Sequence, residues 1–341
     1  MKTLVTSSGV VCAETLWGCP QCGQRMHKHD SERRRWRHMD SCQFKTIVVA
    51  DVPRVKCPQH GSQTVRVPWA EPRSRFTTWF ERLAIDVLQE CSTAAACEHL
   101  RITWSEADGI KQRAIDRGLR RRKQEALLRL CIDEKAVGWG HQYVTIVSCA
   151  DQRPARVLAV EDDREETSLD RFWASLSPGQ RAGVQTVAMD MWTAFQNSTL
   201  RHVPDAAGKI VFDNFHVAKH MNKAVDEVRR TEHAALQALG DTTLKGSRQL
   251  WLYGLENVPG KWAARFEALR QSAKVVRMLK SHWDNIVTYF RHRLCNAAAE
   301  GINSRIQQLI QQACGYRNRA RFKRDVLFHL GGLDLHPQTA Q

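Results

Sequence analysis

The chain has 341 residues, 43% of them hydrophobic and including 11 Trp and 11 Phe, so it can bury large cores and we expect two or three domains. This composition excludes an intrinsically disordered protein, and the lack of any stretch near the roughly 20 apolar residues that cross a bilayer excludes a transmembrane protein. Met1–Val11 has neither the basic start nor the apolar run of a signal peptide, so we expect a cytoplasmic protein whose cysteines stay reduced and which has no membrane partner.

The positive charge is concentrated toward the N-terminus. The formal net charge is +15, and residues 1–123 contain 22 Lys and Arg against 13 Asp and Glu, a net charge of +9. Because each neutralised phosphate releases condensed counterions, such an excess indicates a protein that binds a polyanion such as DNA. The alternative is a basic surface without a partner.

Residues 1–72 contain two similar short motifs, Cys19-Pro-Gln-Cys22 and Cys57-Pro-Gln-His60. Two ligands two residues apart can chelate one Zn²⁺ through a tight turn, for which Gly23 supplies a flexible residue. The β-rich run Phe44–Val49 between the motifs is typical of a zinc ribbon. We therefore predict one structural Zn²⁺ bound by Cys19, Cys22, Cys57 and His60. Two unrelated turns are the alternative, and His27, His29 and Cys42 compete for a ligand position.

Residues 73–123 have helical periodicity from Phe76 to about Arg117. A short alanine-rich helix begins after Ser92 and breaks at 101–103, and Thr103-Trp-Ser-Glu106 is a capping box that starts a second helix. This pattern predicts a helix-turn-helix with the second helix in the major groove of DNA, followed by a basic linker at 118–123. The expected DNA-binding residues are Ser105, Lys111, Gln112, Arg113, Arg120, Arg121, Arg122 and Lys123. An ordinary helical hairpin is the alternative.

Residues 124–341 have the pattern of one α/β domain. Five short apolar runs predict strands at Leu130–Ile132, Tyr143–Val147, Val157–Val160, Val184–Ala188 and Lys209–Phe212. Three strands in succession, then helix, strand, helix and strand, predict a mixed sheet with the order of ribonuclease H-like folds. Residues 215–290 are helical in pattern and would form an insertion outside the sheet. A last helix is expected from about Cys295 to Gln312, followed by a basic tail.

Three acidic residues could meet at one edge of this sheet. Asp133 is expected at the end of the first strand and Asp190 just after the fourth, and Glu300 begins a helix after three alanines. Carboxylates gathered in this way suit two Mg²⁺ ions, which could cleave a phosphodiester. The alternatives stay open. A strand-end Asp often only caps a turn, Glu300 lies opposite the apolar stripe of its helix, and Asp213 also follows a strand.

The chain resembles the ISL-three family of bacterial insertion-sequence transposases along nearly its whole length. The resemblance rests on the Cys19/Cys22/Cys57/His60 region and on separate motifs that occur in the family's order. They are Asp51–Pro58, Val67–Phe76, Asp133–Lys135, Gly140–Tyr143, Asp213–Lys219, Arg277–Lys280, Asn296–Ser304 and Gly331–Leu335. Around Arg270–Lys274 the chain lacks several helical turns that relatives carry.

The resemblance implies that Asp133, Asp190 and Glu300 are the DDE carboxylates of a ribonuclease H-like domain and hold Mg²⁺ or Mn²⁺. It implies binding to double-stranded DNA at terminal inverted repeats, strand cleavage, and joining of the freed 3′-hydroxyls to target DNA. It also implies a homo-oligomer, at least a dimer on DNA, in the bacterial nucleoid. The rival hypothesis is a DNA-binding regulator whose zinc ribbon and helix-turn-helix do the work beside a catalytically degenerate α/β domain.

Overall fold

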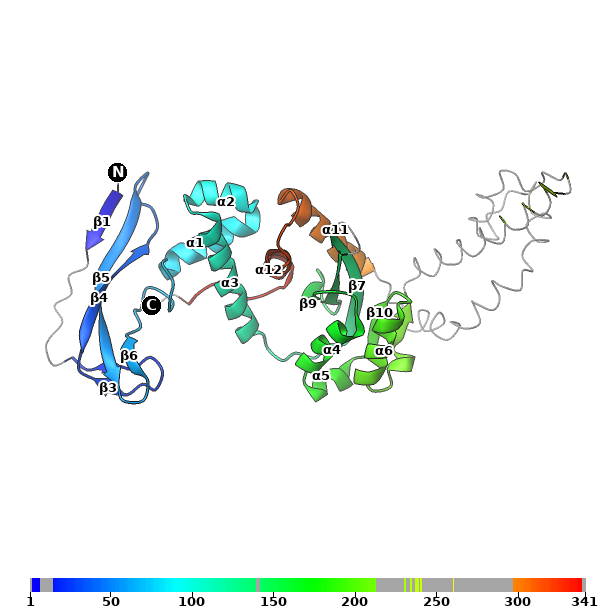
Figure 1. Ribbon diagram of the computed structural model, residues 1–341, viewed down its shortest axis with the longest axis horizontal. Coiled ribbons are helices and arrows are strands. Elements are labelled where there is room, and N and C mark those ends of the chain that lie inside the picture. The colour runs from blue at the N-terminus through cyan, green and yellow to red at the C-terminus, as the bar shows by residue number, and fades with distance from the viewer. Residues whose placement is uncertain are drawn as a thin grey trace. The chain divides into compact units, whose positions relative to one another are not determined.

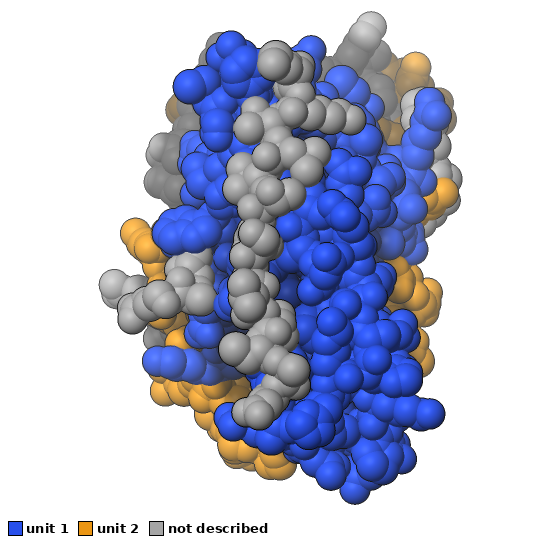
Figure 2. Space-filling model, turned by 90° about the vertical axis from the view of Figure 1, so that its left-hand side faces the viewer, with its two compact units in different colours: residues 1–123, 309–341 blue, residues 124–308 orange. Residues whose placement is uncertain are grey.

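A computed structural model describes residues 2–6, 15–138, 142–212 and 297–338, with single positions between 230 and 260. The chain divides into two compact units, residues 1–123 with 309–341 and residues 124–308 (Figure 2). The helical insertion expected at 215–290 lies outside the described residues, apart from those single positions. No helix in the described part of the chain is long and apolar enough to cross a membrane.

The N-terminal part of the first unit is a four-stranded sheet built around one long strand. The central strand β5 (Lys45–Cys57) pairs with β1 (Lys2–Thr6) in parallel and with β4 (Asp30–Arg37) and β6 (Gly61–Thr64) in antiparallel fashion. A separate hairpin joins β2 (Trp17–Gly18) to β3 (Arg25–Met26). These hairpins place the two cysteine motifs at turns, as expected for the zinc ribbon.

The helical part of the first unit begins with α1 (Thr78–Glu90), α2 (Thr93–Leu100) and α3 (Trp104–Arg121). Ser92 caps α2, and the capping box between Thr103 and Glu106 starts α3, as predicted. The prediction of a basic linker at 118–123 is wrong, because α3 continues to Arg121. Gly118 lies in its last turns, where a Cβ atom would come within 2.6 Å of Leu333 Cβ, so a glycine is needed there for close packing.

The C-terminal segment belongs to this first unit and not to the α/β domain. After α11 (Ala297–Gln312), the expected basic tail is a helix, α12 (Arg319–Leu330), which packs against α3 (Figure 1). Phe328 and Leu335 are buried in the same apolar core as α1, α2 and α3. The compact unit that contains the mixed sheet therefore ends at residue 308, whereas one α/β domain was expected over 124–341.

The second unit contains a five-stranded mixed sheet in the order β11-β10-β7-β8-β9. Its strands are β7 (Arg129–Gly138), β8 (Gln142–Cys149), β9 (Arg156–Glu161), β10 (Thr186–Met189) and β11 (Ile210–Phe212). The first three pair antiparallel, and β10 lies parallel to both β7 and β11. This arrangement confirms the mixed α/β fold with the strand order of ribonuclease H-like sheets.

Helices cover both faces of this sheet. On one face, Leu130 and Ile132 of β7 share a large core with α4 (Glu166–Ser175) and α6 (Thr193–His202). Two short helices follow these in the chain, α5 (Pro178–Gly183) after α4 and η1 (Ala206–Gly208) after α6. On the other face, Ala298 and Ala299 of α11 pack against Cys131 of β7 and Ala188 of β10. The small side chains allow this close approach, as the sequence indicated.

Candidate functional site

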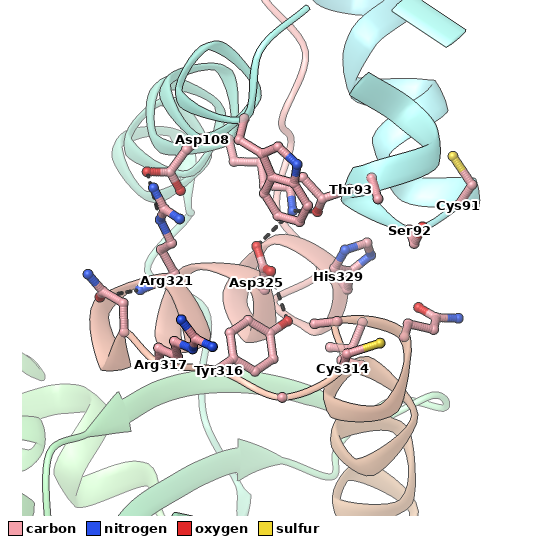
Figure 3. A pocket seen from close by; sticks show the side chains of 18 residues that line it. Cys91, Ser92, Thr93, Asp108, Cys314, Tyr316, Arg317, Arg321, Asp325 and His329 are labelled. Atoms are coloured by element: carbon pink, nitrogen blue, oxygen red, sulfur yellow. Dashed lines mark hydrogen bonds and ion pairs between the residues drawn. The ribbon is translucent and has the colours of Figure 1, made fainter. Parts of the chain in front are cut away.

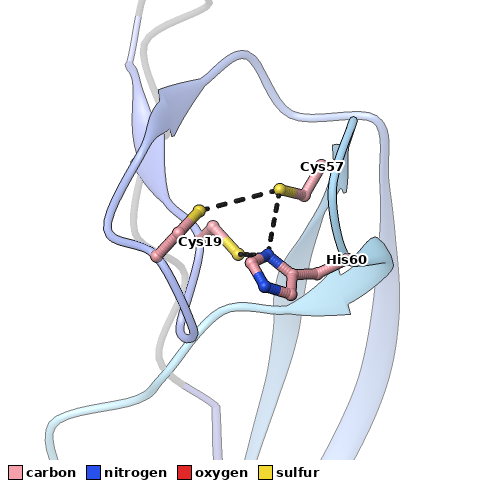
Figure 4. Close-up of side chains that lie close together, drawn as sticks. Cys19, Cys57 and His60 are labelled. Atoms are coloured by element: carbon pink, nitrogen blue, oxygen red, sulfur yellow. Dashed lines mark hydrogen bonds between the residues drawn. The ribbon is translucent and has the colours of Figure 1, made fainter.

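The four predicted zinc ligands lie together where two turns of the N-terminal part meet (Figure 4). The turn between β2 and β3 carries Cys19 and Cys22, and the turn from β5 to β6 carries Cys57 and His60. The Sγ atoms of Cys22 and Cys57 are 3.7 Å apart, and Cys57 Sγ lies 3.4 Å from His60 Nδ1. All four ligand atoms lie within 4.8 Å of one another.

This spacing fits a tetrahedral zinc ion. With Zn–S bonds of about 2.3 Å, two thiolates on one ion lie about 3.8 Å apart, whereas a disulfide would need about 2 Å. Gly23 adopts a φ of 75° in the first turn, as expected from its position. The competing residues His27, His29 and Cys42 do not join the cluster, which among the described residues is the only such group of three or more Cys, His, Asp or Glu.

The hydrogen bonds around Cys19 also favour metal binding. Hydrogen bonds from the backbone N–H groups of Cys22 and Gln21 lower the pKa of the Cys19 thiol to about 6. A metal binds the thiolate and not the thiol, so this environment favours the ligating form near neutral pH.

The expected DNA-binding residue Lys111 is buried inside the first unit. Only 2% of Lys111 is exposed, and its Nζ atom lies 2.8 Å from both Asp325 Oδ1 and Thr93 Oγ1. Asp325 also accepts a hydrogen bond from the Tyr316 hydroxyl at 2.8 Å, on the wall of a pocket of about 700 Å³ (Figure 3). The prediction that Lys111 faces DNA is therefore wrong, because its charge is used to attach α12 to α3.

Arg113 is also engaged within the protein. Its Nε atom donates to Glu81 Oε1 at 2.8 Å, and Glu81 is 1% exposed. Arg117 lies one turn further along α3, contacts Glu81 Oε2 at 3.2 Å and forms a two-point ion pair with Glu71. Its guanidinium also donates to the carbonyl of Leu335. Arg113 and Arg117 therefore stabilise the unit, and Arg113 is less available to DNA than expected.

Replacing Arg117 by methionine should destabilise the first unit by about 3–5 kcal/mol, because removing one partner of a buried ion pair leaves the other charge uncompensated. Arg120→Met is the matched control, since Arg120 lies on the same helix but is exposed. Urea unfolding followed by helical circular dichroism measures both. Equal midpoints for Arg117→Met and wild type would contradict this account of the network.

Of the other expected DNA-binding residues, some are exposed and others form hydrogen bonds or ion pairs within the protein. Ser105, Arg120 and Lys123 are exposed. Gln112 is exposed but bonds to Asp116 and Arg324. Arg121 pairs with Asp334 at 2.9 Å, and Arg122 donates to the carbonyl of Gly331 at 3.2 Å.

Asp133 lies within β7 and not at its end. The strand continues to Gly138 because it forms a long hairpin with β8. The pairing of β7 with β10 nevertheless stops at Cys131 and Ala188, two residues before Asp133 and Asp190. Since neighbouring strands lie about 4.8 Å apart, the register puts these two aspartates at adjacent positions on one edge.

The two aspartates also belong to the face that α11 covers. Residues two apart in a strand share a face. Asp133 is therefore on the same face as Cys131, which packs against Ala299. Asp190 comes directly after β10, and its Oδ1 accepts a hydrogen bond from the Trp192 N–H at 2.9 Å. Asp190 therefore caps a turn, which was the alternative role for an aspartate at the end of a strand.

Glu300 lies in the first turn of α11 and is exposed, as the apolar stripe of the helix indicated. Three residues further along, Asn303 donates from Nδ2 to Asp133 Oδ2 at 2.7 Å. Positions three apart are neighbours on a helix surface, so Glu300 adjoins the residue that contacts Asp133. Among the described residues, the three carboxylates do not form a group whose oxygen atoms lie close enough together to share one metal ion. Asp213 lies outside the described residues.

One cationic side chain near this edge, that of Lys135, was not predicted from the sequence. Lys135 follows Asp133 on the same face of β7; burial lowers the pKa of its amino group, while Asp133 opposes that shift. The Arg164 guanidinium lies 4.5 Å from the Tyr143 ring and 4.6 Å from the Trp192 ring. Arg164 is also paired with Glu134 Oε2 at 3.3 Å, and Glu134 is on the opposite face of β7 from Asp133. Lys135 is therefore the cation that lies on the same face as Asp133.

Three family models match successive parts of the chain. They are the zinc-finger of transposase IS204/IS1001/IS1096/IS1165 at residues 15–60, the helix-turn-helix domain of transposase family ISL3 at 65–114, and the ISL3 transposase domain at 130–273 and 259–326. The chain belongs to the ISL3 family of transposases. Within this ISL3 chain, the two segments of the third match overlap at 259–273, next to the shortened insertion expected around residues 270–274.

Two curated relatives are named for insertion sequences. The chain is 25% identical to the transposase for insertion sequence element IS1001 of Bordetella parapertussis, over 89% of this chain and 86% of that protein. It is 27% identical to the transposase for insertion sequence element IS1557 of Mycobacterium tuberculosis, over 78% of this chain but only 58% of that protein. At that coverage the similarity to the first relative reaches into each of the three matched regions.

Proposed function

We propose that this chain binds the terminal inverted repeats of an insertion sequence, cleaves the DNA at its ends and joins the freed 3′-hydroxyls to target DNA. The observation that carries the proposal is the register of β7 and β10, which brings Asp133 and Asp190 to adjacent positions under α11. Glu300 in the first turn of that helix completes the set. Because an element has two ends, at least two copies would assemble on DNA.

In this proposal the three acids hold divalent cations. Carboxylate oxygens are the ligands that Mg²⁺ and Mn²⁺ prefer. When bound, two such ions activate the attacking oxygen and stabilise the leaving oxygen of an in-line displacement. Asp133 is held by hydrogen bonds from Asn303 and from the Glu134 backbone N–H, so one ligand is fixed in place. Lys135 would attract the phosphate backbone toward the carboxylates.

The zinc ribbon and helix-turn-helix would hold the inverted repeat. The N-terminal end of α3 is accessible, with Trp104 49% exposed and Ser105 beside it. A recognition helix contacts base edges with its N-terminal residues, so Ser105 is the proposed base contact. Arg120 and Lys123 are exposed cations near the end of α3 and are the proposed phosphate contacts.

Arg120→Ala and Lys123→Ala should each weaken binding to all DNA sequences and reduce the salt slope of log K by about 0.9, the value for one lost phosphate contact. Ser105→Ala should instead relax the preference at one base position. Lys111→Met is the control, measured where the variant is folded, because its buried amino group releases no counterion. Unchanged slopes for Arg120→Ala and Lys123→Ala, with a reduced slope for Lys111→Met, would refute this assignment.

A further inference from the structure

Asn303 contacts Asp133 in a defined orientation. Its side-chain amide lies 2.7 Å from Asp133 Oδ2. An ionised carboxylate only accepts hydrogen bonds, so the amide must present its NH₂ group to Asp133. The amide oxygen, Oδ1, therefore points away from that bond, and the orientation follows from chemistry alone.

The Oδ1 atom of Asn303 is buried and has no hydrogen-bond partner in the described part of the chain. Buried polar atoms are nearly always paired, because an unmet acceptor loses its water without replacement. An amide oxygen is also a ligand that hard divalent cations and their bound water accept. The missing partner is therefore expected to be a group that the protein binds.

The position of Asn303 over the sheet is fixed by packing on both sides. Ala299 is 3% exposed and packs against Cys131 and Ala188, while Ile302 and Ile306 are 2% and 0% exposed. The helix therefore holds Asn303 at the strand edge where Asp133 and Asp190 lie adjacent. Glu300 is three residues away and shares that side of the helix.

We propose that Asn303 is a positioning residue of the cation site, which holds Asp133 through Nδ2 and turns Oδ1 toward a divalent cation or its bound water. This inference rests on the proposed function, since it assigns a partner to the same carboxylates. Groups that orient a ligating carboxylate typically change metal affinity by about 10- to 100-fold when removed. Asn303 therefore sets how tightly the site binds its cation.

The test uses the full-length, zinc-loaded chain and MnCl₂ as the probe. Asn303→Leu keeps the branched shape but removes both polar atoms, and Gln307→Ala on the same helix is the control because Gln307 is exposed. Electron paramagnetic resonance of free Mn²⁺ gives the affinity without DNA. We expect about tenfold weaker Mn²⁺ binding for Asn303→Leu and wild-type binding for Gln307→Ala. Equal affinities for Asn303→Leu and wild type would overturn the inference.

A second variant tests orientation separately from packing. Asn303→Asp replaces the donor by a carboxylate beside Asp133, and two adjacent carboxylates share a proton, which raises the pKa of the pair. The low-pH limb of Mn²⁺ binding should then move to higher pH in Asn303→Asp, which tests whether residue 303 lies beside a carboxylate that binds the cation. This variant also decides the matter if Asn303→Leu does not fold. An unmoved limb would contradict the inference.

The two proposals fail in different ways. If wild type binds element ends but never cleaves them with Mn²⁺, the proposed function fails, while Mn²⁺ affinity still reports on Asn303. If wild type cleaves and Asn303→Leu needs the same MnCl₂ concentration for half-maximal cleavage, the role of Asn303 fails and the transposase proposal stands.

Discussion

Asp133→Ala should reduce cleavage at element ends by at least about 10³-fold and leave binding to those ends unchanged. Affinity comes mainly from phosphate contacts of basic residues, which this substitution does not touch. A catalytic cation stabilises transition-state charge by several kcal/mol, and about 4 kcal/mol corresponds to about 10³-fold in rate. Single-turnover cleavage with Mn²⁺ at saturating protein measures the loss.

The same loss is expected for Asp190→Ala and Glu300→Ala, and Asp213→Ala is the internal control. Asp213 follows β11 in the chain as Asp190 follows β10, so it is the rival for the second carboxylate. An inactive Asp213→Ala variant beside an active Asp190→Ala variant would show that the second carboxylate has been misassigned.

Cys57→Ser should abolish zinc binding and unfold the N-terminal part of the first unit. Cys57 is 2% exposed and lies within 4 Å of both Cys22 Sγ and His60 Nδ1. Structural zinc sites contribute about 10–16 kcal/mol of apparent free energy in small domains, which is comparable to or larger than the roughly 5–15 kcal/mol that stabilises a typical domain. Metal analysis should give about one equivalent of zinc for wild type and none for Cys57→Ser.

Cys42→Ser provides the matched control for zinc, because Cys42 is exposed and lies outside the cluster. It should retain the metal. Limited proteolysis of Cys57→Ser should cut within residues 15–66 while the sheet and helices of residues 142–212 remain protected. Zinc retained by Cys57→Ser, or lost from Cys42→Ser, would mean that the ligand set is wrong.

The fold follows largely from local sequence signals. The cysteine motifs, the caps at Ser92 and Thr103, and the five apolar runs of the α/β unit each specify a nearby element. Strand β4 was not predicted, because its sequence, Asp-Ser-Glu-Arg-Arg-Arg-Trp-Arg, is almost entirely polar. It is a strand because it pairs with β5. Asn318 does cap α12, but the position of that helix depends on contacts with α3 about 200 residues away.

The burial of Lys111 shows why charge alone misassigned part of α3. Lys111 lies four residues after Ala107 and three before Ala114, so helical periodicity already placed it on the buried stripe. Its partner Asp325 lies 214 residues further along, which no local pattern specifies. Asn303 was missed for the same reason, since its contact with Asp133 spans 170 residues.

The most direct test of the proposed function is cleavage of DNA that carries this element's own ends. Purified full-length protein is incubated with an end-labelled duplex spanning the element boundary, with MgCl₂ or MnCl₂, and the strand breaks are mapped on a sequencing gel. The proposed function predicts breaks at the boundary that free a 3′-hydroxyl, and no breaks with EDTA. Saturating binding to the same duplex without any break would contradict it and favour a DNA-binding regulator.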